Sequence, residues 1–160
     1  MEKSQGTKVI FPGSFDPFTR GHEAVVAEAL RIFDSVVIGI GDNIGKRGLL
    51  PVEKREALIR DLYADNPRVE VRTYSSLTGD FAYRCGAKAI VRGVRTGYDI
   101  EYEQNMASVN RRLYPDLTTV ILCTPAEVAH ISSSVVRELL EFGRNVDDFM
   151  PEGVDIRLYL

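Results

Sequence analysis

The hydrophobic positions of this chain fall into short runs that alternate with longer amphipathic stretches. The short runs are rich in β-branched residues and predict strands at residues 7–11, 35–40, 69–74, 89–91 and 119–123. Between and after them, apolar residues recur every three or four positions, which predicts helices at residues 23–33, 52–63, 79–85, 99–113 and 133–142. The tail from Pro151 is a candidate for one more helix.

Alternation of strands and helices, with nearly continuous apolar strands, is typical of a parallel sheet that helices cover on both faces. We therefore expect an α/β fold with a doubly wound, parallel five-stranded sheet, in a single domain over residues 1–160. Ligands of such sheets bind beyond the carboxyl ends of the strands, where the strand order reverses. The pattern by itself leaves the order of the strands open.

Composition excludes some function classes. The chain has 160 residues, of which 44% are hydrophobic, and this suffices for one core. A net charge of −3 without a basic tail argues against nucleic acid as a partner. Cys85 and Cys123 lack metal-ligand spacing, so we expect reduced, buried thiols in a cytoplasmic protein. The first residues are unlike a signal peptide, and apolar runs are too short to span a membrane, so we expect no membrane partner.

The most informative stretch is Gly-Ser-Phe-Asp-Pro-Phe-Thr-Arg-Gly-His at residues 13–22, between the first strand and the first helix. Its glycines let backbone approach a ligand closely, and a helix start offers free N–H groups to an anion. His22 at that position can donate a hydrogen bond to a phosphoryl oxygen. The stretch predicts a phosphate-binding loop, and it resembles the signature of the nucleotidyltransferase superfamily.

Two other glycine patterns resemble known nucleotide-binding motifs but do not match them. The segment from Gly41 to Lys46 has three residues between its glycines instead of the four of a P-loop, and Arg47 stands where Ser or Thr would bind Mg²⁺. A dinucleotide-binding fingerprint that begins at Gly39 lacks its last glycine. We interpret this segment as a solvated glycine-rich loop.

Three further polar clusters follow predicted strands. They contain Lys46, then Arg-Gly-Val-Arg at residues 92–95 leading to Asp99 and Glu103, and then His-Ile-Ser-Ser-Ser at residues 130–134 with Arg137. These clusters supply cations, hydroxyls and a helix start, but neither paired catalytic carboxylates nor a Ser-His-Asp arrangement. Such groups suit the positioning of polyanions and the stabilisation of developing negative charge.

Four motifs in this order resemble the bacterial phosphopantetheine adenylyltransferase family over nearly the full chain. They are Pro-Gly-Ser-Phe-Asp-Pro-x-Thr-x-Gly-His, Arg-Gly-Val-Arg, Asp-x-Glu-Tyr-Glu-x-x-Met-Ala-x-x-Asn-Arg and Ile-Ser-Ser-Ser-x-Val-Arg. The resemblance implies a Rossmann-like fold and transfer of AMP from ATP to 4′-phosphopantetheine, which gives dephospho-coenzyme A and pyrophosphate. It also implies direct in-line attack without a covalent intermediate, Mg²⁺ as cofactor, a cytoplasmic homohexamer, and feedback binding of coenzyme A.

The resemblance implies a role for each matched residue. The catalytic residues would be His22, Lys46 and Arg95. ATP would be bound by Ser14, Phe15, His22, Gly93, Val94, Arg95, Glu103, Val128, Ala129, His130, Ile131, Ser132, Ser133 and Ser134. The acceptor would be bound by Ser14, Lys46, Thr78 and Arg92. Mg²⁺ would bridge oxygens of ATP with few protein ligands, and no residue is assigned as a metal ligand.

The chain departs from the family pattern at three of these positions. Ser14 replaces a threonine, Thr78 replaces an apolar residue, and Val128 stands where some members have an aromatic residue. Apolar residues at helical spacing in the helix 99–113 favour core or subunit packing: Tyr102, Met106, Val109 and Leu113.

Two alternatives stay open from the sequence. The first is another nucleotidyltransferase of the same superfamily, acting on nicotinamide mononucleotide or glycerol phosphate. The second is a nucleotide-binding sensor without turnover, which would not need the donors His22, Lys46 and Arg95.

Overall fold

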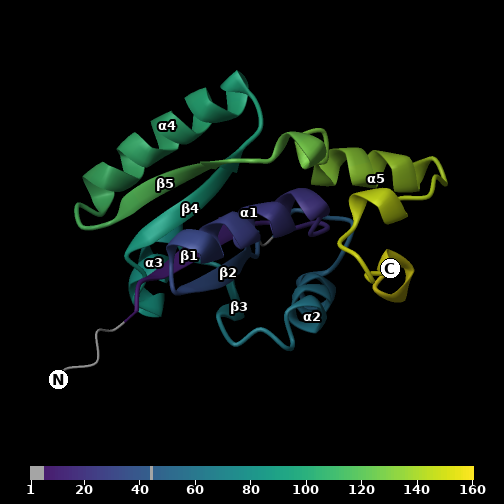
Figure 1. Ribbon diagram of the computed structural model, residues 1–160, viewed down its shortest axis with the longest axis horizontal. Coiled ribbons are helices and arrows are strands. Elements are labelled where there is room, and N and C mark those ends of the chain that lie inside the picture. Colours follow the sequence, from purple (N-terminus) through teal and green to yellow (C-terminus); the bar gives the residue numbers. More distant parts are fainter. Residues whose placement is uncertain (1–5, 44) are drawn as a thin grey trace.

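A computed structural model describes residues 6–43 and 45–160, which form a parallel sheet with helices on both faces (Figure 1). The elements follow in the order β1 (Lys8–Gly13), α1 (Arg20–Ile32), β2 (Ser35–Gly41), α2 (Val52–Leu62), β3 (Val69–Tyr74), α3 (Thr78–Cys85), β4 (Ala89–Val94), α4 (Gly97–Leu113), β5 (Thr118–Cys123) and α5 (Ser133–Glu141). The five strands lie in the order β3-β2-β1-β4-β5 and all pair in parallel. This confirms the predicted fold class.

The alternation along the strands divides the core into two layers. Val9, Phe11 and Val36 pack on one face with buried residues of α1, α2 and α5, whereas Ile10 and Val37 pack on the other with α3 and the end of α4. Successive strand side chains point to opposite faces, so two hydrophobic layers follow from nearly continuous apolar strands.

The strand order reverses between β1 and β4, which are neighbours in the sheet but lie far apart in the sequence. The chain leaves β1 toward β2 on one side, and it leaves β4 toward β5 on the other. Loops at the carboxyl ends of these two strands therefore diverge and leave room for ligands.

Several predicted boundaries require correction. Strands β1 and β4 run on to Gly13 and Val94, so residues 92–94 lie within a strand and not after it. Their pairing with β2 and β5 continues through these residues, which the apolar runs alone did not indicate. Helix α1 begins at Arg20, so His22 lies in its first turn.

The tail does not form an α-helix; it makes 3₁₀ turns at Asp147–Phe149 and Ile156–Leu158. The C-terminal end of the chain lies beside α2 (Figure 1). The hydroxyl of Tyr159 donates to the carboxylate of Asp61 in α2 at 2.6 Å. Cys85 is buried, but Cys123 is exposed, contrary to expectation, because β5 is an edge strand. Among the described helices, none is both long and apolar enough to cross a membrane.

Candidate active site

Two adjoining cavities lie at the carboxyl ends of β1 and β4. The first has a volume of about 470 Å³ and the second of about 380 Å³. They share six lining residues, namely Pro12, Gly13, Ser14, Arg92, Tyr102 and Glu103. Two ligands bound in them would therefore meet beside Ser14 and Arg92.

The loop after β1 is shaped by Phe15. This residue has a φ of 50°, in the left-handed backbone region that residues other than glycine rarely adopt. Its ring is buried and packs edge-on against Phe11 and His22, with centroids 5.2 and 5.0 Å away. A Cβ atom at Gly13 would overlap this ring, which explains the glycine. Ring burial offsets the backbone strain and leaves Ser14 exposed at the junction of the cavities.

His22 is held in one orientation by the start of its own helix. The backbone N–H of Thr19, the N-cap residue of α1, donates to Nδ1 of His22 at 3.0 Å. Burial, and secondly the positive charges of Arg92 and Arg95, lower the pKa of His22 from 6.5 to about 3. The imidazole is therefore neutral at pH 7, and because Nδ1 accepts, its proton lies on Nε2. His22 lines the second cavity as a hydrogen-bond donor, unsuited to proton transfer at neutral pH.

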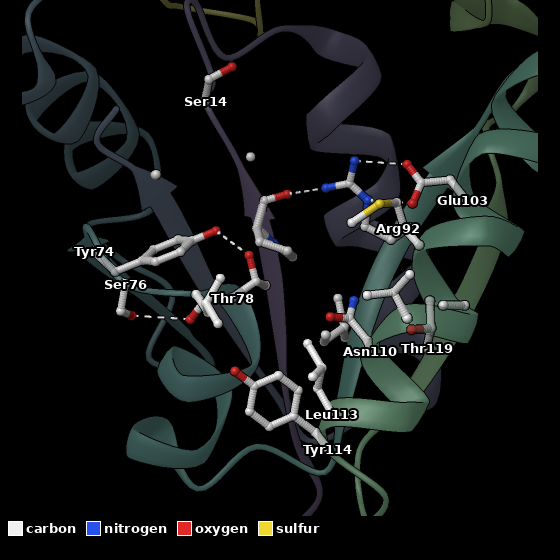
Figure 2. Close-up of a pocket in the computed structure, with 18 of the residues that line it drawn as sticks. Ser14, Tyr74, Ser76, Thr78, Arg92, Glu103, Asn110, Leu113, Tyr114 and Thr119 are labelled. Atoms are coloured by element: carbon white, nitrogen blue, oxygen red, sulfur yellow. Dashed lines mark hydrogen bonds and ion pairs between the residues drawn. The ribbon is translucent and has the colours of Figure 1, made fainter. Parts of the chain in front are cut away.

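Arg92 lies between the two cavities and is held by Glu103 of α4 (Figure 2). The Nε and Nη2 atoms of Arg92 donate to the two carboxylate oxygens of Glu103, at 2.9 and 2.8 Å. The Nη1 atom of Arg92 donates to the carbonyl of Pro12 at 2.7 Å. Glu103 is only 6% exposed, so this pair is substantially desolvated. A guanidinium has five N–H donors, so two of them stay free for an anion.

The start of α5 brings hydroxyls to the second cavity. The hydroxyl of Ser132, the N-cap residue, accepts a hydrogen bond from the backbone N–H of Val135 at 3.2 Å. The hydroxyl of Ser133 donates to the carbonyl of Pro17 at 2.8 Å, and Arg137 donates to the carbonyl of Asp16 at 2.7 Å. These bonds attach the start of α5 to the loop after β1, so its N–H groups and serines lie at an anion-binding position.

Arg95 follows β4 and lines the same cavity. Its side chain pairs with Asp99 at 3.2 Å, and its backbone N–H donates to the same carboxylate at 2.9 Å. Desolvation would raise the pKa of Asp99, but hydrogen bonds from Arg95 and its charge outweigh this and hold the pKa below its ordinary value. The carboxylate is thus ionised at neutral pH and keeps Arg95 at the rim.

Asp16 connects the loop after β1 to the loop after β2. Its buried carboxylate accepts hydrogen bonds from the backbone N–H groups of Leu49 and Leu50, at 2.7 and 2.8 Å. Arg55 of α2 adds a second link, because its guanidinium donates to the carbonyls of Ser14 and Leu50, at 2.7 and 3.1 Å. The loop that carries Lys46 is therefore anchored at its end to the site.

The first cavity has two chemically different walls (Figure 2). Hydroxyl-bearing residues at the end of β3 and the start of α3 form one wall: Tyr74, Ser75, Ser76 and Thr78. The other wall belongs to α4, with the carboxamide of Asn110 among apolar side chains, Tyr102, Met106, Val109 and Leu113. These four were expected to pack in a core or a subunit contact. All four are exposed residues that line the cavity, so they do not pack in the core of this chain, and the subunit contact stays a prediction.

The structure brings most of the predicted site residues together. Those that line the second cavity are Ser14, Phe15, His22, Arg92, Gly93, Arg95, Glu103, Ile131, Ser132, Ser133 and Ser134, and the first cavity adds Thr78. Five predicted residues lie outside the lining of both cavities, namely Lys46, Val94, Val128, Ala129 and His130. Lys46 is exposed in its loop, Val94 is buried, and His130 packs edge-on against Phe149.

Sequence reasoning missed Tyr74 and Asn110 as lining residues. Asn110 lies within the third motif, which was a usable signal, whereas Tyr74 was marked only by its place at the end of a predicted strand.

Comparison with known proteins places the chain in a family. Residues 10–139 match the family described as cytidylyltransferase-like. A phosphopantetheine adenylyltransferase of Bacteroides thetaiotaomicron is 50% identical over 93% of this chain and 98% of its own length. One from Porphyromonas gingivalis is 52% identical over 90% of the chain and 94% of its length, and one from Thiobacillus denitrificans is 41% identical over 93% of each. The chain belongs to the phosphopantetheine adenylyltransferase family. It is therefore an enzyme, a nucleotidyltransferase.

Solved structures support the fold of this phosphopantetheine adenylyltransferase family member. A bifunctional NMN adenylyltransferase/ADP ribose pyrophosphatase of Francisella tularensis aligns with a TM-score of 0.70 at 18% identity, over 91% of this chain and 45% of that chain. The same protein complexed with AMP and a manganese ion aligns with a TM-score of 0.69 at 17% identity, over 96% of this chain and 46% of that chain. At this identity the likeness shows a shared nucleotidyltransferase fold.

Proposed function

We propose that this enzyme transfers the adenylyl group of ATP to 4′-phosphopantetheine and releases dephospho-coenzyme A and pyrophosphate. The observation that carries this proposal is the pair of cavities that meet at Ser14 and Arg92. In the proposal, ATP occupies the second cavity, beside His22 and the serines of α5. The acceptor occupies the first cavity with its phosphate at the junction.

The chemistry needs little from the protein beyond positioning and electrostatics. The second pKa of a phosphate monoester is about 6, so the acceptor oxygen is already largely ionised at pH 7. In the proposed step this oxygen attacks the α-phosphorus of ATP in line, the bond to the β-phosphate oxygen breaks, and pyrophosphate leaves with the electron pair. Neither a general base nor a covalent intermediate is needed.

The proposed roles follow from the contacts. The Nε2–H of His22 donates to the α-phosphate as negative charge builds there. The two free donors of Arg92 hold the acceptor phosphate, and Glu103 fixes the guanidinium that does so. Arg95, Ser132, Ser133 and Ser134 surround the remaining ATP phosphates from the rim and from α5. For Lys46 we keep the predicted role of binding the acceptor phosphate from its loop.

Magnesium fits this site only as part of the substrate. Two of the carboxylates that line the cavities, those of Glu103 and Asp99, are engaged by Arg92 and Arg95. Among the described residues, no group of three or more His, Cys, Asp or Glu side chains could hold a metal ion. We therefore propose that Mg²⁺ enters as its complex with ATP, coordinated by phosphate oxygens and water.

We keep three further properties as proposals. A homohexamer is supported by exposed apolar side chains on α4 and β5, such as Tyr98, Ile100 and Ile121, and sedimentation velocity tests it.

Feedback binding of coenzyme A is supported by the adjoining cavities, because a ligand that resembles the product would fill both, and calorimetric titration with coenzyme A tests it. A cytoplasmic location is supported by the free thiols of Cys85 and Cys123, and fractionation of source cells tests it.

The test is product analysis with competing acceptors. The purified enzyme is incubated with ATP and Mg²⁺ and either 4′-phosphopantetheine, nicotinamide mononucleotide or glycerol 3-phosphate, and the adenylylated product and pyrophosphate are quantified. We expect stoichiometric dephospho-coenzyme A and pyrophosphate with phosphopantetheine only. Turnover with nicotinamide mononucleotide or glycerol 3-phosphate instead would show a different member of the superfamily. Tight ATP binding without product from any acceptor would show a nucleotide sensor.

A further inference from the structure

Two hydroxyl groups of the first cavity form a pair. The side-chain oxygens of Tyr74, at the end of β3, and Thr78, at the start of α3, lie 3.1 Å apart (Figure 2). Both residues line the cavity at a distance from the cations of the junction. Thr78 replaces an apolar residue of the family pattern, so this hydroxyl pair distinguishes the chain from that pattern.

The pair is held rigidly. The ring of Tyr74 stacks on Phe81 of α3, with centroids 4.3 Å apart and an interplanar angle of 7°. Phe81 is buried and fills the space beside Gly39 of β2, where a Cβ atom would overlap the phenylalanine ring. The tyrosine hydroxyl is therefore fixed before a ligand arrives, which lowers the entropic cost of a hydrogen bond to that ligand.

The hydrogen-bonding capacity of the pair matches one secondary amide. Two hydroxyls have two hydrogens, and one is used between Tyr74 and Thr78, so one O–H donor and several lone pairs are left. A secondary amide needs one donor for its carbonyl oxygen and one acceptor for its N–H. The opposite wall is largely apolar, with Met106, Val109 and Leu113. Such a cavity suits a flexible chain of methylene groups interrupted by amides.

We propose that the Tyr74–Thr78 hydroxyl pair binds an amide group of the acceptor and thereby selects acceptors with an amide-bearing arm. This inference rests on the proposed function and deepens it, because phosphopantetheine carries two amides between its phosphate and its thiol. The pair makes no contact with the reacting phosphates; it positions the arm. Its removal is therefore expected to weaken acceptor binding and to leave the chemical step unchanged.

Kinetics of matched variants provide the first test. Tyr74→Phe and Thr78→Val each remove one hydroxyl with little change of shape, Thr78→Ser keeps the hydroxyl, and Tyr83→Phe removes an α3 hydroxyl from outside the cavity. We expect KM for phosphopantetheine to rise about threefold to tenfold in the first two variants, the range for one hydrogen bond. The KM for ATP and kcat should stay at wild-type values in these two variants, and every parameter of Tyr83→Phe should stay at its wild-type value. Thr78→Ser, which keeps the hydroxyl, should raise the KM for phosphopantetheine less than Thr78→Val does. A purely structural role would change both KM values.

Infrared spectroscopy provides the direct test. Phosphopantetheine labelled with ¹³C at either amide carbonyl is bound at saturation to the wild type and to the double variant Tyr74→Phe/Thr78→Val, which has neither hydroxyl of the pair. We expect the amide band of one carbonyl to shift to lower frequency on binding to the wild type, and this shift to be lost in the variant. If the wild type makes dephospho-coenzyme A but the amide bands are identical in both proteins, the amide-binding inference is overturned and the proposed function stands. A wild type that makes no dephospho-coenzyme A would overturn the proposed function as well.

Discussion

Replacement of His22 by alanine is the most informative single perturbation of this site. Because Nδ1 accepts from the N–H of Thr19, Nε2–H is the one donor that the imidazole can offer to a phosphate. Loss of a comparable donor to developing negative charge costs about 2.7–4 kcal/mol, which is about a hundredfold to a thousandfold in kcat. Because this donor acts mainly on charge that develops in the transition state, KM for ATP should change far less than kcat.

The assay is pre-steady-state formation of pyrophosphate at saturating ATP and phosphopantetheine. His22→Gln is the matched variant, because its amide nitrogen can reach toward the position of Nε2, and we expect it to retain more activity than His22→Ala. Thermal unfolding serves as the control, since the imidazole also packs against Phe15 and Phe18. A large loss of ATP affinity with unchanged kcat would refute the assignment of His22 to the transition state.

Three further predictions concern stability and positioning. Glu103→Gln removes a charge-assisted bond to Arg92 and should lower the free energy of unfolding by roughly 1.5–3 kcal/mol in urea titrations, with a raised KM for the acceptor; an unchanged KM would contradict the positioning role. Asp16→Asn leaves the backbone N–H of either Leu49 or Leu50 without its acceptor, and it should lower the free energy of unfolding by about 1–3 kcal/mol in the same urea titration. A free energy of unfolding equal to that of the wild type would contradict this. The unfolded chain protonates His22 near pH 6.5 but the folded protein only near pH 3, so the unfolded state binds more protons in that window. The free energy of unfolding should therefore fall as pH decreases from about 6.5 to 3, by at most roughly 1.4 kcal/mol per pH unit from this group, and His22→Asn should remove this contribution. Identical pH profiles for wild type and His22→Asn would contradict the low pKa.

The sequence predicted the elements and much of the lining of the candidate site, because local signals specify them. Glycine, helix-cap and helix-start patterns predicted two segments of the candidate site, residues 13–22 and the serines at residues 132–134. The structure brings residues of both segments to one cavity. Strand ends were predicted too short at Gly13 and Val94, because strand pairing extends beyond the apolar runs.

Pairings between distant residues could not be predicted. The partnership of Arg92 with Glu103 spans a strand and a helix, and the bonds of Asp16 to Leu49 and Leu50 join two loops. Both depend on the order of the strands, which the apolar pattern left open. The apolar face of α4 was assigned to core or subunit packing, because hydrophobic spacing alone does not distinguish a core, a subunit contact and the wall of a ligand cavity.

The central claim is that two anionic substrates in adjoining cavities react directly. The stereochemical course at phosphorus tests this claim most directly. A single diastereomer of adenosine 5′-O-(1-thiotriphosphate) is supplied with phosphopantetheine, and the configuration of the thio-substituted dephospho-coenzyme A is determined by ³¹P NMR. One in-line displacement predicts inversion of configuration at the α-phosphorus. Retention would reveal an adenylylated enzyme intermediate and would contradict the account.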